Sequence, residues 1–174
     1  MNSDAHVYGL SMFSLACDEG LEKEILDELK TAAALFKENA GYSSLLDSPA
    51  VSLDERLSLI DTAFSGAHMY VLNFLKILCE KRYTHLFIEC VKEYEKAYEK
   101  KNNITRITAI TARTLSDDQR TRLIKKLENE YGKKVILSEI VDKSIIGGIV
   151  IKSENSQTDA SVLSRLNALR SSLK

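Results

Sequence analysis

Apolar residues recur every three or four positions through the first hundred residues, which is the spacing of amphipathic helices. A first stripe follows Asp4, a candidate N-cap, and a second runs from Leu21 to Phe36, after which Gly41 is expected to supply a left-handed stop. The first stripe contains apolar or small side chains at Tyr8, Ser11, Met12, Leu15 and Ala16. The pattern therefore opens with two helices.

Further helical stripes follow a short turn predicted over residues 42–46. Ser52 and Glu55 form an S-x-x-E capping box at the start of one helix, which is expected to end near Gly66. Two more stripes run over residues 71–79 and 86–98. Five or six helices with short connections predict a compact all-α bundle over residues 1–103.

The periodicity changes at Ile104, where residues 104–111 are β-branched and alternate as in a half-buried strand. Ser116 and Gln119 form a second capping box, opening a helix that is expected to stop at Gly132. Three further elements are predicted: strands at 135–141 and 145–151, and a leucine-spaced terminal helix at 160–173. The fold class is therefore α+β, with a small β-α-β-β-α domain over residues 104–174.

Composition supports a folded, helix-rich protein, because 44% of the 174 residues are hydrophobic, 28% are charged and only one is proline. No apolar run approaches the roughly 20 residues that span a bilayer. No Lys or Arg precedes Lys23, so neither a secretory signal nor an organellar transit peptide is expected.

The two halves differ in charge, with 11 basic and 17 acidic residues up to Asn103 against 13 basic and 8 acidic residues beyond it. A basic second half leaves an RNA-binding adaptor open as an alternative. The predicted strands contain no aromatic residue on which bases could stack, which weakens that alternative. No nucleic-acid partner is therefore predicted.

Candidate chemistry is sparse. The three cysteines have no zinc or disulfide spacing, and the histidines have no metal-binding spacing, so no metal, cofactor or catalytic residue is predicted. Gly147 and Gly148 lie within a predicted apolar strand rather than in a phosphate-binding loop. A small enzyme that pairs Cys79 or Cys90 with His85 stays open as a second alternative, because the fold decides which side chains meet.

Two of the predicted helices could form a groove that receives a helix from another protein. The candidate groove residues are Tyr8, Ser11, Met12, Phe74, Ile77 and Leu78. Periodicity alone favours the other interpretation, in which these side chains face the bundle core.

Three segments of the chain carry a family resemblance. They are residues 8–13, Tyr-Gly-Leu-Ser-Met-Phe; residues 73–82, which begin Asn-Phe-Leu and end in Arg; and residues 141–149, Val-Asp-Lys-Ser-Ile-Ile-Gly-Gly-Ile. Together with Asp159, Ser161 and Val162, their order and spacing resemble the delta subunits of bacterial F-type ATP synthases, relatives of the mitochondrial oligomycin-sensitivity-conferring protein. Asp142, Gly147 and Gly148 belong to the most specific motif, in which Lys143 stands where proline is usual.

The resemblance implies a non-catalytic stator subunit of a proton-translocating ATP synthase, peripheral to the cytoplasmic face of the bacterial plasma membrane. It implies that residues 1–103 bind an alpha-subunit N-terminal helix in the candidate groove. It further implies that residues 104–174 bind the b subunits of the peripheral stalk, joining the catalytic head to the membrane.

Overall fold

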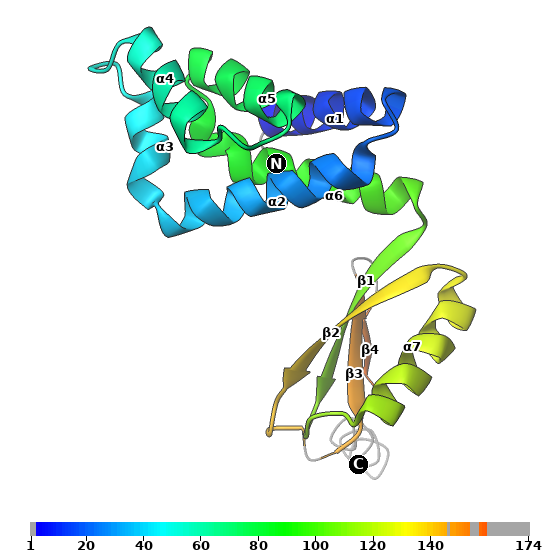
Figure 1. Cartoon of the computed structure of the whole chain (residues 1–174). Coiled ribbons are helices and arrows are strands. Elements are labelled where there is room, and N and C mark those ends of the chain that lie inside the picture. The colour runs from blue at the N-terminus through cyan, green and yellow to red at the C-terminus, as the bar shows by residue number, and fades with distance from the viewer. Residues whose placement is uncertain (1–2, 146, 154–156, 160–174) are drawn as a thin grey trace. The chain divides into compact units, whose positions relative to one another are not determined.

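The computed structural model describes residues 3–145, 147–153 and 157–159, with only the backbone of the last three (Figure 1). The chain divides into two compact units, Met1–Tyr98 and Glu99–Lys174. This division falls inside a helix, slightly before the position at which the sequence pattern changes. Each unit has its own hydrophobic core.

The first unit is built from helices joined by short connections, which confirms the all-helical first half. The helices are α1 (Ser3–Asp18), α2 (Glu22–Glu38), α3 (Ala40–Asp47), α4 (Leu53–Ala63), α5 (Met69–Glu80), the 3₁₀ turn η1 (Thr84–Leu86) and α6 (Phe87–Lys101). The predicted capping box of α4 is present, because the Glu55 amide donates to Ser52 Oγ at 3.3 Å and the Ser52 amide donates to Glu55 Oε2 at 3.2 Å.

Three local predictions in this unit were wrong. Residues 42–46 are not a turn but belong to α3, and Gly41 lies inside that helix rather than acting as a left-handed stop. Helix α2 ends instead at Glu38, and the amide of its C-cap residue, Asn39, donates to the Leu35 carbonyl. Asp4 is not an N-cap, since α1 begins one residue earlier and Asp4 lies in its first turn.

Aromatic rings fill the centre of the helical core. Phe36 packs against Phe87 with ring centroids 4.8 Å apart, and Phe13 meets Tyr94 edge to face at 5.3 Å. Such contacts add to the burial of large apolar surface. Met12, Phe74 and Leu78 also belong to this buried cluster.

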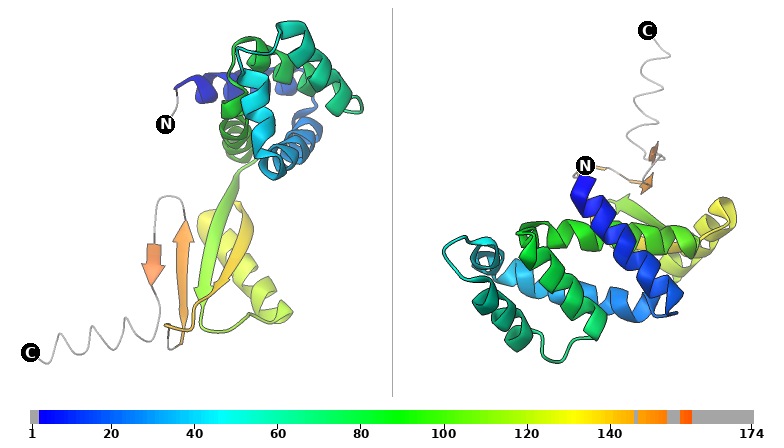
Figure 2. Two further views of the ribbon diagram at one scale, coloured as in Figure 1. Left: turned by 90° about the vertical axis from the view of Figure 1, so that its left-hand side faces the viewer. Right: turned by 90° about the horizontal axis from the view of Figure 1, so that it is seen from above.

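Helices α1 and α6 lie against each other in the helical unit (Figure 2), and they approach very closely at Gly9. A methyl group added to Gly9 would lie 2.6 Å from the Cys90 carbonyl oxygen and 2.9 Å from Glu93 Cβ. The buried face of α1 is made of small or slender side chains, namely Ala5, Gly9, Met12 and Ala16. Small residues let two helix backbones approach each other, so this face fixes how deeply α1 sits.

In the part of the second unit that the structure describes, α7 packs on one face of a four-stranded sheet (Figure 1). Its elements are β1 (Ile104–Thr111), α7 (Asp117–Tyr131), β2 (Lys134–Val141), β3 (Ile149–Ser153) and β4 (Gln157–Asp159), in the spatial order β2-β1-β3-β4. Strands β1 and β2 are parallel and joined through α7, whereas β3 is antiparallel to β1 and to β4. Leu127 of α7 packs on Ile107 and Val135.

The predicted start and stop of α7 are confirmed, since the Ser116–Gln119 capping box is present and Gly132 has a left-handed φ of 63°. The third strand was predicted to begin at residue 145 but begins at Ile149. Gly147 and Gly148 therefore precede the strand rather than lying in it, and Gly148 has a φ of 88°, which favours glycine. The predicted helix at 160–173 lies outside the described residues.

Replacing Gly9 with Ala is expected to lower the free energy of unfolding by about 1–3 kcal/mol, because the new methyl group meets α6 backbone. Gly41→Ala is the matched control, since Gly41 lies in α3 with open space around its Cα. The control is expected to change stability by less than about 1 kcal/mol or to raise it. Urea unfolding measures both, and equal effects of the two variants would contradict the close approach.

Candidate functional site

A groove of about 750 Å³ lies between α1 and α5 in the first unit. Both helices contribute side chains, and a tyrosine that follows α5 adds one more. The lining residues are Asp4, Val7, Tyr8, Ser11, Met12, Leu15, Tyr70, Asn73, Phe74, Ile77 and Tyr83.

Helix α1 presents its second apolar face to the groove. Val7 is 56% exposed and Leu15 is 40% exposed, although one side of this helix is already buried in the core. Ser11 donates its hydroxyl to the Val7 carbonyl oxygen at 2.8 Å, so its polar group is satisfied within the helix. The Ser11 hydroxyl therefore adds no unpaired polar group to the apolar surface that α1 offers to the groove.

Helix α5 forms the opposite wall. Ile77 is 46% exposed, whereas Phe74 is 6% exposed and packs against Phe87 with ring centroids 6.3 Å apart. Phe74 thus forms the floor of the groove and part of the core at once. An ion pair between Lys76 Nζ and Asp61 Oδ1 at 2.6 Å ties α5 to α4.

Tyr83 contributes to the groove from outside the helices. Arg82 has a φ of 57°, and the Tyr83 amide then donates to the Leu78 carbonyl at 2.7 Å. This reversal of the chain brings the Tyr83 ring to the Tyr8 ring, edge to face, with centroids 6.0 Å apart. The contact joins α1 to the end of α5.

The structure brings together five of the six candidate groove residues: Tyr8, Ser11, Met12, Phe74 and Ile77 all line the groove. Leu78 does not, because it is fully buried in the core. Sequence reasoning missed five residues on the two helices, although each is three or four positions from a predicted groove residue: Asp4, Val7, Leu15, Tyr70 and Asn73. Tyr83 was missed for a different reason. Only the left-handed backbone of the residue before Tyr83 directs the Tyr83 ring into the groove.

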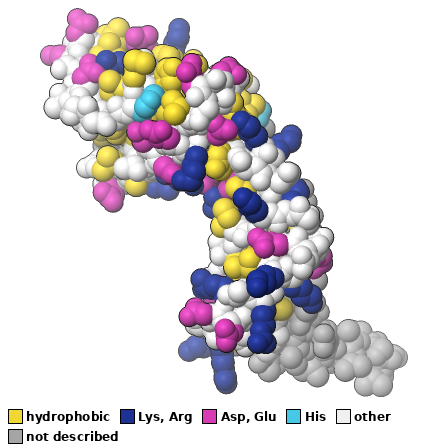
Figure 3. Space-filling model, turned by 45° about the vertical axis from the view of Figure 1, so that its right-hand side comes forward, with side chains coloured by type: hydrophobic (Ala, Val, Ile, Leu, Met, Phe, Trp, Pro, Cys, Tyr) yellow, Lys and Arg dark blue, Asp and Glu magenta, His cyan; other side chains and the backbone are white. Residues whose placement is uncertain are grey.

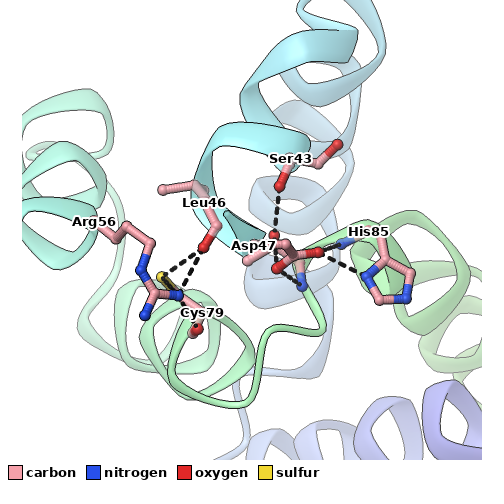
Figure 4. A network of polar contacts seen from close by, with 7 residues as sticks. Ser43, Leu46, Asp47, Arg56, Cys79 and His85 are labelled. Atoms are coloured by element: carbon pink, nitrogen blue, oxygen red, sulfur yellow. Dashed lines mark hydrogen bonds and ion pairs between the residues drawn. The ribbon is translucent and has the colours of Figure 1, made fainter. Parts of the chain in front are cut away.

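A polar network fixes the segment that carries Tyr83 (Figure 4). The Asp47 carboxylate, at the end of α3, accepts hydrogen bonds from the Thr84 and His85 amides at 3.0 Å each. It also binds the Thr84 hydroxyl and lies 2.7 Å from His85 Nδ1. Burial alone would raise the pKa of Asp47, but the hydrogen bonds from Thr84 and His85 together lower it.

A second buried contact joins the ends of α3 and α5. The Arg56 guanidinium, 4% exposed, donates to the Leu46 carbonyl at 2.9 Å and to the Cys79 carbonyl at 3.0 Å. Both carbonyls lie in the last turn of their helices, where backbone groups lack partners and the helix dipole is negative. The positive charge therefore stabilises two helix ends and holds α5 in place.

The geometry does not support a Cys–His enzyme. The Cys79 thiol contacts the Leu46 carbonyl at 3.7 Å, while His85 contacts Asp47 on the other side of that turn (Figure 4). Burial raises the pKa of Cys79, and burial raises that of Cys90 to about 12. Both thiols are therefore protonated at neutral pH, and a thiol is a poor nucleophile.

Lys and Arg side chains are scattered over the second unit on the face shown in Figure 3, with Asp or Glu side chains among them. In this unit Arg120 pairs with Glu139 of β2 at 2.7 Å. Among the described residues, no cluster of three or more His, Cys, Asp or Glu side chains could hold a metal ion. The described helices also include none that is long and apolar enough to cross a membrane.

Fold and groove together define a two-unit protein whose helical unit has an exposed apolar groove. The family model described as ATP synthase delta (OSCP) subunit matches residues 5–173. ATP synthase subunit delta of Clostridioides difficile strain 630 is 31% identical, covering 99% of this chain and 97% of its own. ATP synthase subunit delta of Clostridium botulinum strain Loch Maree is also 31% identical, covering 94% and 92%.

A solved structure of the Toxoplasma gondii mitochondrial ATP synthase hexamer contains a chain with the same fold. It aligns with a TM-score of 0.69 at 21% sequence identity and covers 97% of this chain and 96% of that chain.

The chain belongs to the ATP synthase delta (OSCP) subunit family. This confirms the resemblance and the predicted role, that of a non-catalytic stator subunit of an F-type ATP synthase. The chain accordingly associates with other subunits of that complex. The enzyme alternative is thereby excluded, and the RNA-adaptor alternative has no support.

Replacing Asp47 with Asn is expected to lower the free energy of unfolding at pH 7 by about 1–3 kcal/mol, because an amide cannot accept the same set of hydrogen bonds. The folded-state pKa of Asp47 lies below its unfolded value of about 3.9, so the stabilisation is present above that value and is lost as pH falls through the folded pKa. The difference in the free energy of unfolding between the native chain and Asp47→Asn should therefore become smaller at acidic pH.

Urea unfolding at pH 7 and at about pH 3 tests this expectation. Glu38→Gln, at an exposed residue, controls for the removal of a carboxylate. A gap of the same size at both pH values would show that the ionised carboxylate does not stabilise the fold.

Proposed function

We propose that the groove between α1 and α5 binds the N-terminal helix of an ATP synthase alpha subunit, and that residues 104–174 bind the b subunits of the peripheral stalk. The chain then links the catalytic head to the membrane-anchored stalk on the cytoplasmic face of a bacterial plasma membrane. The two curated relatives are bacterial proteins, which supports that location.

The observation that carries the proposal is the convergence of exposed apolar side chains from two helices. Val7 and Leu15 face the groove from α1, and Ile77 faces it from α5. An amphipathic helix recognises such a surface by placing side chains at helical spacing into it. Burial of apolar surface yields about 25 cal/mol per Å², although the cost of association prevents a direct conversion into affinity.

The mechanical task fits this kind of contact. Rotation within the head exerts a reaction torque on the alpha–beta assembly, so a connector has to hold the head without slipping. An apolar helix seated between two packed helices resists displacement, because sliding it exposes the surface that it buries. The groove walls are themselves fixed, by the Lys76–Asp61 ion pair on α5 and by the packing at Gly9 on α1.

Ile77→Asp is expected to weaken binding of an alpha-subunit N-terminal peptide to the full chain by at least about tenfold, because binding would bury a charge against apolar surface. Ile77 is the right position because it is 46% exposed, whereas Phe74→Asp would also damage the core. Leu53→Asp is the matched control, since Leu53 is 41% exposed and lies away from the groove. Calorimetric titration measures the affinities, and circular dichroism checks folding.

Equal binding by the Ile77→Asp and Leu53→Asp chains would overturn the assignment of the groove. The second contact is tested in the same way, by titrating the full chain with the soluble region of the b subunit. Ile77→Asp is expected to leave that affinity unchanged within about twofold, because Ile77 belongs to the first unit and the b subunits are proposed to bind residues 104–174. Loss of both affinities would mean that the variant disturbs the whole chain.

A further inference from the structure

The groove between α1 and α5 carries an acidic side chain at one end. Among the described residues that line it, Asp4 is the only acidic one, and none is Lys, Arg or His. Asp4 lies in the first turn of α1, one turn before Tyr8, whose ring meets that of Tyr83 just after α5. The negative charge therefore marks the end of the groove at which α1 begins and α5 ends.

The Asp4 carboxylate is exposed, and no hydrogen bond or ion pair engages it among the residues that the structure describes. Carboxylates that face a neighbouring helix in the same unit are paired, as Glu93 is with His6 and Asp61 is with Lys76. An acidic residue in a first turn also stabilises its own helix through the helix dipole. Asp4 can do this and still receive a cation from a partner that lies in the groove.

The charge of the helical half of the chain favours such a partner. Up to Asn103 the chain has 17 acidic and 11 basic residues, and an excess of negative charge speeds the encounter with a positively charged molecule. The groove is long enough to specify where the cation lies. Asp4 and Leu15 both line it from α1, and their separation along that helix corresponds to about 16 Å, or about three turns.

We propose that the groove selects a helix that places a Lys or Arg side chain against Asp4, at one end of an apolar stripe about three turns long. This inference rests on the proposed function, in which the groove receives an alpha-subunit helix. Burial of the apolar stripe against Val7, Leu15 and Ile77 supplies the affinity. The cation at Asp4 supplies selectivity, because charges at the edge of an interface act mainly on specificity and association rate.

Titration calorimetry of the full chain with an alpha-subunit N-terminal peptide, at low and at high salt, tests the inference. Asp4→Asn is expected to weaken binding about three- to tenfold at about 0.02 M salt but less than about twofold at about 0.5 M salt. The difference arises because dissolved ions screen the attraction between exposed charges.

Asp54→Asn is the matched control. Asp54 is exposed and lies in the first turn of α4, so this variant removes the same kind of helix-end charge away from the groove. It is expected to change the affinity less than about twofold at either salt concentration. Circular dichroism and urea unfolding show whether either variant alters the fold.

A double-mutant cycle identifies the pairing residue of the peptide. Each Lys or Arg of the peptide is changed in turn to Gln. One of these changes is expected to weaken binding to the native chain about three- to tenfold, but binding to Asp4→Asn less than about twofold. A role of Asp4 confined to the first turn of α1 would produce no such coupling, because both peptides meet the same α1 in each variant.

The outcomes separate this inference from the assignment of the groove. Binding that Ile77→Asp weakens, but in which no peptide cation is coupled to Asp4, would overturn the inference and leave the groove assigned. An equal salt dependence of the native and Asp4→Asn chains would overturn it in the same way. Absence of binding, or binding that Ile77→Asp does not weaken, would overturn both.

Discussion

The close packing of α1 on α6 at Gly9 is the constraint on which the groove depends. A helix that buries one face and still offers apolar side chains on the other has to be held firmly. The buried face of α1 is small, and Gly9 lets its backbone reach the α6 backbone. The other face of α1 then places Val7 and Leu15 in the groove beside α5, in a position that the packing at Gly9 fixes. Gly9 therefore allows the close approach of α1 to α6 that a larger residue would prevent.

Polar contacts fix the other parts of the groove, namely α5 and the segment that carries Tyr83. Arg56 joins the last turns of α3 and α5 through their carbonyl groups, and Asp47 holds the amides of Thr84 and His85. The first contact positions α5, and the second positions the segment just after Tyr83. Both satisfy backbone groups that helix ends leave without partners. The groove is thus bounded by helices whose ends are fixed, as the proposed contact with the alpha subunit requires.

Sequence periodicity predicted the elements well where one face is buried and the ends carry standard signals. The capping boxes at Ser52 and Ser116 and the left-handed Gly132 were read directly from the sequence. The stop predicted at Gly41 was wrong, because a glycine in a helix with open space around it looks the same in sequence as a helix stop. The strand predicted over Gly147 and Gly148 was wrong as well, since an apolar run does not reveal where pairing with β1 begins.

The groove could be predicted only in part from the sequence. Spacing alone identified the helix faces that carry Tyr8, Ser11, Phe74 and Ile77, but it could not separate the groove from the core. Leu78 is one position beyond Ile77 and is fully buried, while Ile77 is 46% exposed. Tyr83 depends on the backbone reversal at Arg82, which has no sequence signature of its own. Contacts between distant segments decided these cases.

Hydrogen–deuterium exchange of the full chain, with and without the alpha-subunit N-terminal peptide, tests the central claim most directly. It reports which backbone segments a ligand protects without altering any residue. The account predicts slower exchange in α1 and α5, with the second unit unchanged. Protection confined to residues 99–159, or no protection at saturating peptide, would contradict it.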